Sequence, residues 1–379
     1  MATSKSSNRP IAWFGPHLTG RELERLRDVL DRQYVNDGPL AREFERRIAA
    51  FVRTKHAVAV TSGTAAIALS LMAVGIGPGD EVLVPDLTFI ATANAVRLAG
   101  ADVKLVEVEP VRFAVDPGAV EAAIGPRTRA LVTVDVNGRG ADYTRLEPLC
   151  RKAGIVLICD AAEALGSRFA GRMLGSFGLA GCFSFSANKT ITAGQGGMVV
   201  TDSDALHDRL RELKDQGRRK GGTGGDDDHP VLGFNFKFTD LQAAVALAQF
   251  DEIEGRLAAA VRRDKAYVER LAKQPGLRLP PFSEPGEVRQ WTDVLIEDRA
   301  AVSAALDAVQ IGNRAFWHPL HRQLPYRAGD DGFAHSIAVS RCGLWLASRL
   351  DLSESDIDYA ASVTIAALRN RKISNPAGS

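Results

Sequence analysis

The chain has few cysteines and no apolar run long enough to cross a membrane. Its four cysteines show neither CxxC pairing nor metal-finger spacing: Cys150, Cys159, Cys182 and Cys342. Because most of them lie in or beside apolar runs, we expect buried free thiols, which are typical of a reducing compartment, and no metal site. The polar first ten residues lack the apolar core of a signal peptide. The sequence therefore predicts a cytoplasmic protein with no membrane contact.

An excess of charge of one sign is also missing. The 47 basic residues nearly balance the 46 acidic ones, so no global field attracts nucleic acid or an anionic membrane. The chain contains no GxxxxGK[ST] loop and no GxGxxG turn, which argues against sites for nucleoside triphosphates or dinucleotides. The composition leaves a globular protein of 379 residues, long enough for one large domain and one smaller domain.

Short apolar runs alternate with helical stretches over the first 160 residues. The predicted strands are 57–60, 81–84, 103–106, 130–134 and 155–159, and the predicted helices are 19–33, 40–53, 65–74, 88–98, 117–124 and 143–153. This alternation predicts an α/β fold with a mostly parallel sheet covered on both faces. We expect a large domain over 15–250, a continuous helix over 239–271 that links the domains, and a small α+β domain over 251–379.

The segment 217–230 combines glycines with a basic and an acidic cluster and has nothing with which to build a core. It is either a disordered connector or a lid that closes over an anionic ligand through Arg218, Arg219 and Lys220.

Lys189 follows a strand-like run and precedes the glycine-rich turn Gly194-Gln195-Gly196-Gly197. A lysine between buried segments costs several kcal/mol of desolvation unless it is compensated. Such a lysine can act as a nucleophilic amine that forms an imine with a carbonyl. The alternative is a surface lysine in a hairpin loop.

Two other strand ends carry polar residues that suit one ligand. Gly63 and Thr64 stand between a strand and a helix, where free N–H groups favour a phosphate, although such residues are often only a helix cap. Asp160 ends a very apolar strand, as a helix cap or as the partner of a protonated ring nitrogen. Together with Lys189, these residues supply what a pyridoxal phosphate enzyme needs, since ligands collect at the carboxyl ends of parallel strands.

Several ordered motifs resemble the DegT/DnrJ/StrS family of sugar aminotransferases, and within it the perosamine-synthase-like members. The resemblance covers about residues 15–365 and rests on 36–39, 59–66, 85–95, 160–166, 183–189, 194–197, 233–244 and 319–321. It implies fold type I, with a mostly parallel seven-stranded sheet in the large domain, and pyridoxal 5'-phosphate as cofactor.

By position, the resemblance makes Lys189 the imine lysine and Asp160 the partner of the ring nitrogen. Phe89, otherwise a core residue, would stack on the ring, and Glu163 would lie beside the ring hydroxyl. The phosphate would be held by Gly63, Thr64 and Ser184, joined by Asn235 from a second subunit, which implies a homodimer with shared active sites.

The chain departs from the family pattern near the expected sugar site. It reads Asp135-Val136-Asn137-Gly138-Arg139 where relatives often have His-x-Tyr-Gly, and Lys237 where they often have Arg. His318 and His321 are candidates for contact with the acceptor or donor, or are core or interface histidines.

The resemblance implies transfer of an amino group from an amino acid, L-glutamate first among candidates, to a nucleotide-linked keto-sugar. Lys189 would move the proton as general base and then as general acid. A cyclitol ketone, a keto-sugar acid without a nucleotide, and a non-catalytic regulatory protein of the same fold remain the alternatives.

Overall fold

A seven-stranded sheet organises the larger part of the computed structural model, which describes residues 10–218, 227–282 and 284–374. The strand order is β1-β9-β8-β5-β4-β2-β3, and β9 alone runs antiparallel to its neighbours. The strands are β1 (His56–Val60), β2 (Glu81–Pro85), β3 (Asp102–Val106), β4 (Thr128–Val134), β5 (Val156–Asp160), β8 (Ala180–Ser184) and β9 (Gly197–Thr201). The predicted mostly parallel sheet is confirmed.

Helices cover both faces of this sheet, because successive residues of each strand point to opposite sides. In β1, Ala57 and Ala59 enter one hydrophobic core, and Val58 and Val60 enter the other. The helices of the larger part are α1 (Arg21–Asp31), α2 (Pro39–Val52), α3 (Gly63–Ala73), α4 (Ala91–Leu98), α5 (Pro117–Ala123), α6 (Tyr143–Ala153), α7 (Asp204–Lys214) and α8 (Asp240–Phe250). A short hairpin of β6 (Arg168–Phe169) and β7 (Arg172–Met173) lies apart from the main sheet.

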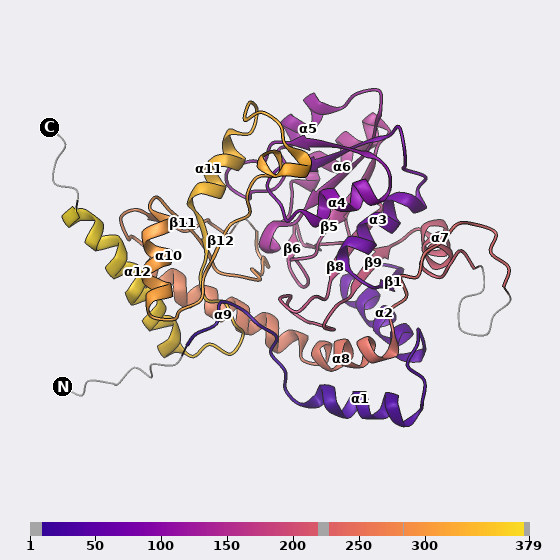
Figure 1. The fold of residues 1–379 in the computed structure, drawn as a ribbon, viewed down its shortest axis with the longest axis horizontal. Helices are drawn as coiled ribbons and strands as arrows, with labels where there is room; N and C mark the ends of the chain where they lie inside the picture. Colours follow the sequence, from indigo (N-terminus) through magenta and orange to yellow (C-terminus); the bar gives the residue numbers. More distant parts are fainter. Residues whose placement is uncertain (1–9, 219–226, 283, 375–379) are drawn as a thin grey trace.

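The long helix expected over 239–271 is interrupted, so that prediction was wrong in its continuity. It forms α8 and α9 (Ile253–Leu271), with Asp251 and Glu252 between them. The Asp251 carboxylate accepts hydrogen bonds from Arg25 of α1 at 2.7 Å and Arg47 of α2 at 2.6 Å. These tertiary contacts hold the break at Asp251 and Glu252, while the nearest glycine, Gly255, lies within the first turn of α9. Figure 1 shows α8 and α9 almost end to end beneath both parts of the molecule.

The smaller part contains a four-stranded antiparallel sheet in the order β10-β11-β13-β12. Its elements are β10 (Leu277–Arg278), β11 (Asp293–Ile296), α10 (Arg299–Ala308), β12 (Arg314–Ala315), α11 (Ala334–Cys342), β13 (Gly343–Trp345) and α12 (Glu354–Ser374). The amino-terminal segment joins it, since Ile11 pairs with Ile311 and lies in its core.

All four tryptophans gather where the smaller sheet meets the larger one. Trp13, Trp291, Trp317 and Trp345 share one hydrophobic cluster with Phe113 and Phe316. The cysteines are free, and three of them are buried, as expected. Within the described ranges, no helix combines the length and the apolar character needed to cross a membrane.

Candidate active site

A cavity of about 330 Å³ opens at the carboxyl ends of β4, β5 and β8, beside the first turn of α3. Seven of the eight residues predicted for catalysis or cofactor binding line it: Gly63, Thr64, Phe89, Asp160, Glu163, Ser184 and Lys189. They come from five separate segments of the chain. The parallel sheet brings them together because its connections place successive strand ends on the same edge.

Lys189 lies in the loop between β8 and β9, and its side chain is only 12% exposed. Its Nζ donates to Glu163 Oε1 over 3.4 Å and lies 5.4 Å from the centre of the Trp291 ring. One long hydrogen bond and an aromatic face leave this ammonium with weak partners for a cation so removed from water. The surface-lysine alternative does not describe this position.

Asp160 ends β5 and is buried at the inner wall of the cavity. Burial raises the pKa of its carboxyl to about 6, although hydrogen bonds from Thr92 Oγ1 at 2.7 Å and the Ala162 backbone N–H at 3.1 Å favour the charged form. Lys189 also lowers this pKa and Glu163 raises it. A carboxylate held in this way is stabilised by any cation that enters the cavity beside it.

The first turn of α3 forms the opposite end of the cavity. Ser62 caps the helix by accepting a hydrogen bond from the Ala65 N–H at 3.1 Å, while Gly63 and Thr64 line the cavity. A Cβ at Gly197 would lie 2.2 Å from the Ser62 carbonyl oxygen, so only glycine allows β9 to begin this close to the helix. The positive end of the helix dipole suits an anion here.

Phe89 lines the same cavity with half of its surface exposed, so it is not a core residue in this chain. An exposed aromatic ring at a cavity mouth offers a flat apolar face to a ligand.

Thr92, Trp291 and Arg314 were not among the predicted site residues, and Asn137 was named only as part of a departure from the family pattern. Thr92 holds Asp160, and Trp291 and Arg314 line the cavity from the smaller part of the molecule. Asn137 joins the two parts: its backbone N–H donates to Glu163 Oε2 at 3.1 Å, and its side chain exchanges hydrogen bonds of 2.7 and 2.8 Å with the Trp291 backbone. One signal existed, since Asn137-Gly138 is a turn dipeptide.

Asn137 adopts a left-handed backbone conformation with φ of 53°, which asparagine tolerates better than most residues. The next residue, Gly138, packs so tightly that an added Cβ would lie 2.0 Å from the Val288 carbonyl oxygen. Residues 135–139, which depart from the family pattern, therefore form part of the contact between the two parts of the molecule. Arg139 completes it with a fully buried ion pair to Asp293 at 2.7 Å.

Asn235 is exposed and does not line the cavity of its own chain. Lys237, the second departure, donates to the Asn235 side-chain oxygen and to Asp215, each at 2.8 Å. The segment thus presents an ordered polar edge to the outside of this chain.

The residues predicted to meet the substrates lie elsewhere. His321 is fully buried, with its ring between Asp86 at 2.7 Å and Asp330 at 3.0 Å, and His318 is exposed. Arg218 pairs with Asp227 at 3.2 Å. None of these three lines the cavity, and Arg219 and Lys220 fall outside the described residues.

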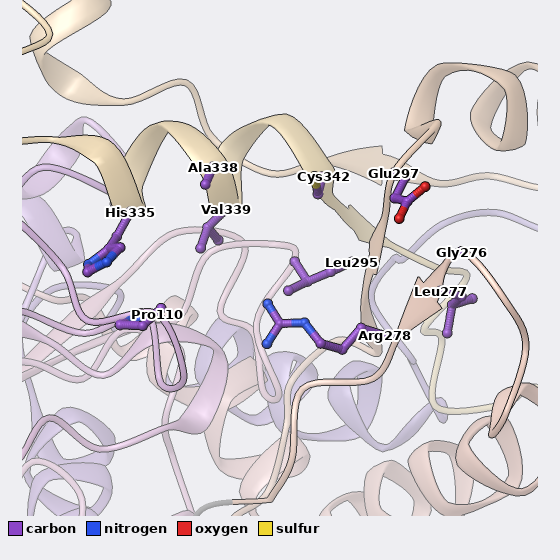
Figure 2. A pocket seen from close by; sticks show the side chains of 10 residues that line it. All are labelled: Pro110, Gly276, Leu277, Arg278, Leu295, Glu297, His335, Ala338, Val339 and Cys342. Atoms are coloured by element: carbon purple, nitrogen blue, oxygen red, sulfur yellow. The ribbon is translucent and has the colours of Figure 1, made fainter. Parts of the chain in front are cut away.

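A second hollow of about 370 Å³ lies between α11 and strands β10 and β11. Figure 2 shows the Arg278 side chain extending beneath Leu295, with His335 on the far side. No described residue of the predicted site lines it.

The geometry agrees with comparisons to known proteins. Residues 16–364 match the sequence pattern of the DegT/DnrJ/EryC1/StrS aminotransferase family. The chain is 37% identical to a GDP-perosamine synthase of Caulobacter vibrioides, over 92% of this chain and 95% of that protein.

Two solved structures share the fold. DesV of S. venezuelae, crystallised with a ketimine intermediate, is 32% identical with a TM-score of 0.86, covering 93% of this chain and 94% of DesV. DesI, crystallised with its TDP-sugar product, is 31% identical with a TM-score of 0.88, covering 97% of this chain and 95% of DesI.

Proposed function

This chain belongs to the DegT/DnrJ/EryC1/StrS aminotransferase family, and we propose that it uses pyridoxal 5'-phosphate to transfer an amino group from L-glutamate to a nucleotide-linked keto-sugar. One observation carries the proposal: Lys189, Asp160 and the first turn of α3 line one cavity. The relatives support the acceptor class, since they include a GDP-perosamine synthase and a protein that binds a TDP-sugar product.

The residues present fit this cofactor. Asp160 is a buried carboxyl whose pKa is raised to about 6 by burial, and a protonated ring nitrogen beside it would favour its charged form. The first turn of α3, with Gly63, Thr64 and nearby Ser184, would hold the phosphate. Phe89 would cover a ring face. When bound, the cofactor supplies an electron sink for the carbanion formed at the carbon that gains or loses nitrogen.

The protein groups then have separate tasks. Lys189 Nζ would take a proton from the amino acid's α-carbon as general base. It would then deliver this proton, as general acid, to the C4′ carbon of the cofactor. Glu163, fixed by the Asn137 backbone N–H, orients that amine from 3.4 Å. The Trp291 ring, whose centre lies 5.4 Å from the amine, shields it from water.

We also propose a homodimer in which Asn235 completes the phosphate site of the partner. Asn235 is exposed, ordered by Lys237 and outside the cavity of its own chain. The proposal keeps the cytoplasmic location expected from the sequence, which the free cysteines support.

The test begins with pyridoxal phosphate added to purified protein, followed by borohydride reduction and peptide mass analysis. We expect one modified peptide, containing Lys189, and none in a Lys189→Ala variant. In a separate, unreduced sample of the cofactor-loaded protein, L-glutamate alone should yield 2-oxoglutarate in one equivalent per site. Modification spread over surface lysines, or no conversion of glutamate, would contradict the proposal and favour a non-catalytic role.

The acceptor is tested separately. A panel of GDP- and TDP-linked keto-sugars, a cyclitol ketone and a free keto-sugar acid should show turnover with the nucleotide-linked compounds. Turnover confined to the cyclitol or the free acid would retain the aminotransferase and change its substrate.

A further inference from the structure

Arg314 is a cation inside the cavity for which the proposed reaction has so far no use. It lies in β12 of the smaller sheet and lines the same cavity as Lys189 and Asp160. Its guanidinium carbon lies 5.2 Å from the centre of the Trp13 ring and 5.8 Å from that of Trp345. The side chain is half-buried.

Among the described residues, no hydrogen-bond or ion-pair partner is found for the Arg314 side chain. Two buried arginines between the two parts are paired: Arg139 with Asp293 at 2.7 Å and Arg289 with Glu287 at 3.0 Å. Stacking on indoles holds a guanidinium by its faces and leaves the N–H groups at its edge available. Arg314 is therefore held in place by the indoles, and its N–H groups remain able to donate to a ligand.

The balance of charges that line the cavity also indicates that Arg314 has a role in ligand binding. Two carboxylates, Asp160 and Glu163, line it together with two cations, Lys189 and Arg314. Glu163 already forms an ion pair with Lys189, and Asp160 is proposed to face the cofactor nitrogen. Arg314 is left to bind an anionic ligand group that arrives with a substrate.

We propose that Arg314 binds the α-carboxylate of the amino-acid donor. This inference rests on the proposed function and names the residue that recognises the donor. A guanidinium edge matches a carboxylate with two parallel hydrogen bonds. A cavity of about 330 Å³ lies at the lower end of the range for ligand sites, roughly 300–1,000 Å³. A nucleoside diphosphate must therefore extend outside it, so an arginine inside the cavity is better placed for the compact donor.

The experiment compares Arg314→Met and Arg314→Lys with wild type in single turnovers of the cofactor-loaded enzyme. The donors are L-glutamate, L-glutamine and L-isoglutamine, in which the α-carboxylate is an amide. We expect Arg314→Met to lower kcat/KM for L-glutamate and L-glutamine by about 10- to 100-fold, mainly through KM, as for loss of a hydrogen-bonded charge pair. Arg314→Lys should lie between.

The comparison with isoglutamine is the decisive part of the experiment. Wild type should use it as poorly as Arg314→Met uses glutamate, and the substitution should cause no further loss with it, because the partner group is already gone. Arg278→Met is the matched control: it removes one positive charge from the same sheet, in the second hollow (Figure 2), and should leave all three donors unchanged. Thermal unfolding checks that each variant is folded.

A second measurement needs no cofactor. Calorimetric titration of 2-oxoglutarate into cofactor-free protein should show binding by wild type and Arg278→Met, weakened at least 10-fold in Arg314→Met. Equal losses with glutamate and isoglutamine, or a loss confined to the keto-sugar step, would overturn the proposal. If wild type converts no glutamate at all, the proposed function fails, and the titration alone then decides whether Arg314 binds a carboxylate.

Discussion

Two clusters of buried charge in the large part of the molecule differ in how well their members are paired. The first, the Glu45 cluster, consists of Asp37, Arg42, Glu45, Arg211 and Lys214. The second, the Lys189 cluster, consists of Asp160, Glu163 and Lys189. Both contain a lysine and two carboxylates removed from most solvent.

The Glu45 cluster is richly connected. Glu45 accepts from the Ala59 N–H at 2.8 Å, from Arg42 at 3.0 Å and from Arg211 at 2.9 Å. Lys214 donates to the Ala59 carbonyl oxygen at 3.0 Å and pairs with Asp37 at 3.0 Å. Burial alone would raise the pKa of Glu45, but attraction to Lys214 and Arg211 outweighs it and lowers the pKa to about 2.

In the Lys189 cluster the balance is reversed. Asp160 has a pKa raised to about 6, because burial outweighs its two hydrogen bonds and the more distant Lys189. Among the described residues, the Lys189 side chain donates one hydrogen bond, of 3.4 Å, to Glu163. Burial of charge therefore does not by itself identify a catalytic site in this protein. What distinguishes the Lys189 cluster is that its incompletely paired groups line a cavity, where a ligand can complete them.

The largest expected effect separates the two lysines. Lys189→Met should abolish glutamate conversion, with a loss of at least about 10³-fold, since it removes the general base and acid, and should change the free energy of unfolding by about 1 kcal/mol or less. Lys214→Met leaves Glu45 and Asp37 with fewer partners and should destabilise by about 3 kcal/mol.

Single-turnover rates are measured on both variants with cofactor added. Urea unfolding is measured on both variants without cofactor. Lys214→Met protein that is folded at low temperature should retain its single-turnover rate within a few-fold, because the described partners of the Lys214 amine, Asp37, Glu45 and Ala59, do not line the cavity. Equal destabilisation by the two substitutions would show that Lys189 is as firmly paired as Lys214, against the comparison.

The next effect concerns the two carboxylates and pH. When the pKa of a carboxyl is higher in the folded protein than in the unfolded chain, ionisation of that carboxyl destabilises the fold. The contribution of Asp160 to the free energy of unfolding is therefore lost as pH rises from about 4 to about 6. Glu45 has the opposite sign: its contribution is present above about 4.5 and is lost as pH falls toward about 2. Each shift corresponds to an effect on the order of 3 kcal/mol.

We therefore expect Asp160→Asn to be more stable than wild type at pH 8 by up to about 3 kcal/mol and equal to it near pH 4. Glu45→Gln should be less stable by about 3 kcal/mol at pH 8, and the difference should shrink in acid. Urea unfolding of the cofactor-free proteins at several pH values measures both differences. If Asp160→Asn destabilises at pH 8, Asp160 is already satisfied and the contrast between the clusters disappears.

The cavity residues that the sequence predicted share one property. Gly63, Asp160 and Ser184 stand at or next to the ends of strands, and a parallel sheet gathers such positions on one edge whatever the rest of the chain does. The alternation of strands and helices, and therefore the sheet, could be predicted because each element carries its own local apolar pattern.

The missed residues depend on long-range packing instead. Trp291 and Arg314 reach the cavity only because the smaller sheet docks on the larger one, and no local pattern encodes that docking. The break between α8 and α9 has the same origin, in ion pairs from Arg25 and Arg47 to Asp251. Sequence reasoning therefore recovered most of the site residues of the larger part, apart from Thr92, and missed those that the smaller part contributes.

The smallest expected effect tests that second half. Asn137→Ala removes the side-chain hydrogen bonds to the Trp291 backbone and leaves the backbone N–H that serves Glu163. Two buried backbone groups then lose their partner, which should cost about 1–3 kcal/mol of stability. We expect a loss of about 10-fold in single-turnover rate, since Trp291 lies over the Lys189 amine.

Thr133→Val is the matched control, because it removes a buried hydroxyl that bonds Tyr143 at 3.2 Å without touching the cavity. It should lower stability to a similar degree and leave the rate unchanged. The pH dependence of the rate separates positioning from general weakening: only Asn137→Ala should move it, through the altered surroundings of Lys189 and Glu163. If both substitutions slow the reaction equally, with unchanged pH profiles, the smaller part acts only as a support, and incomplete pairing in the Lys189 cluster is set by the large sheet alone.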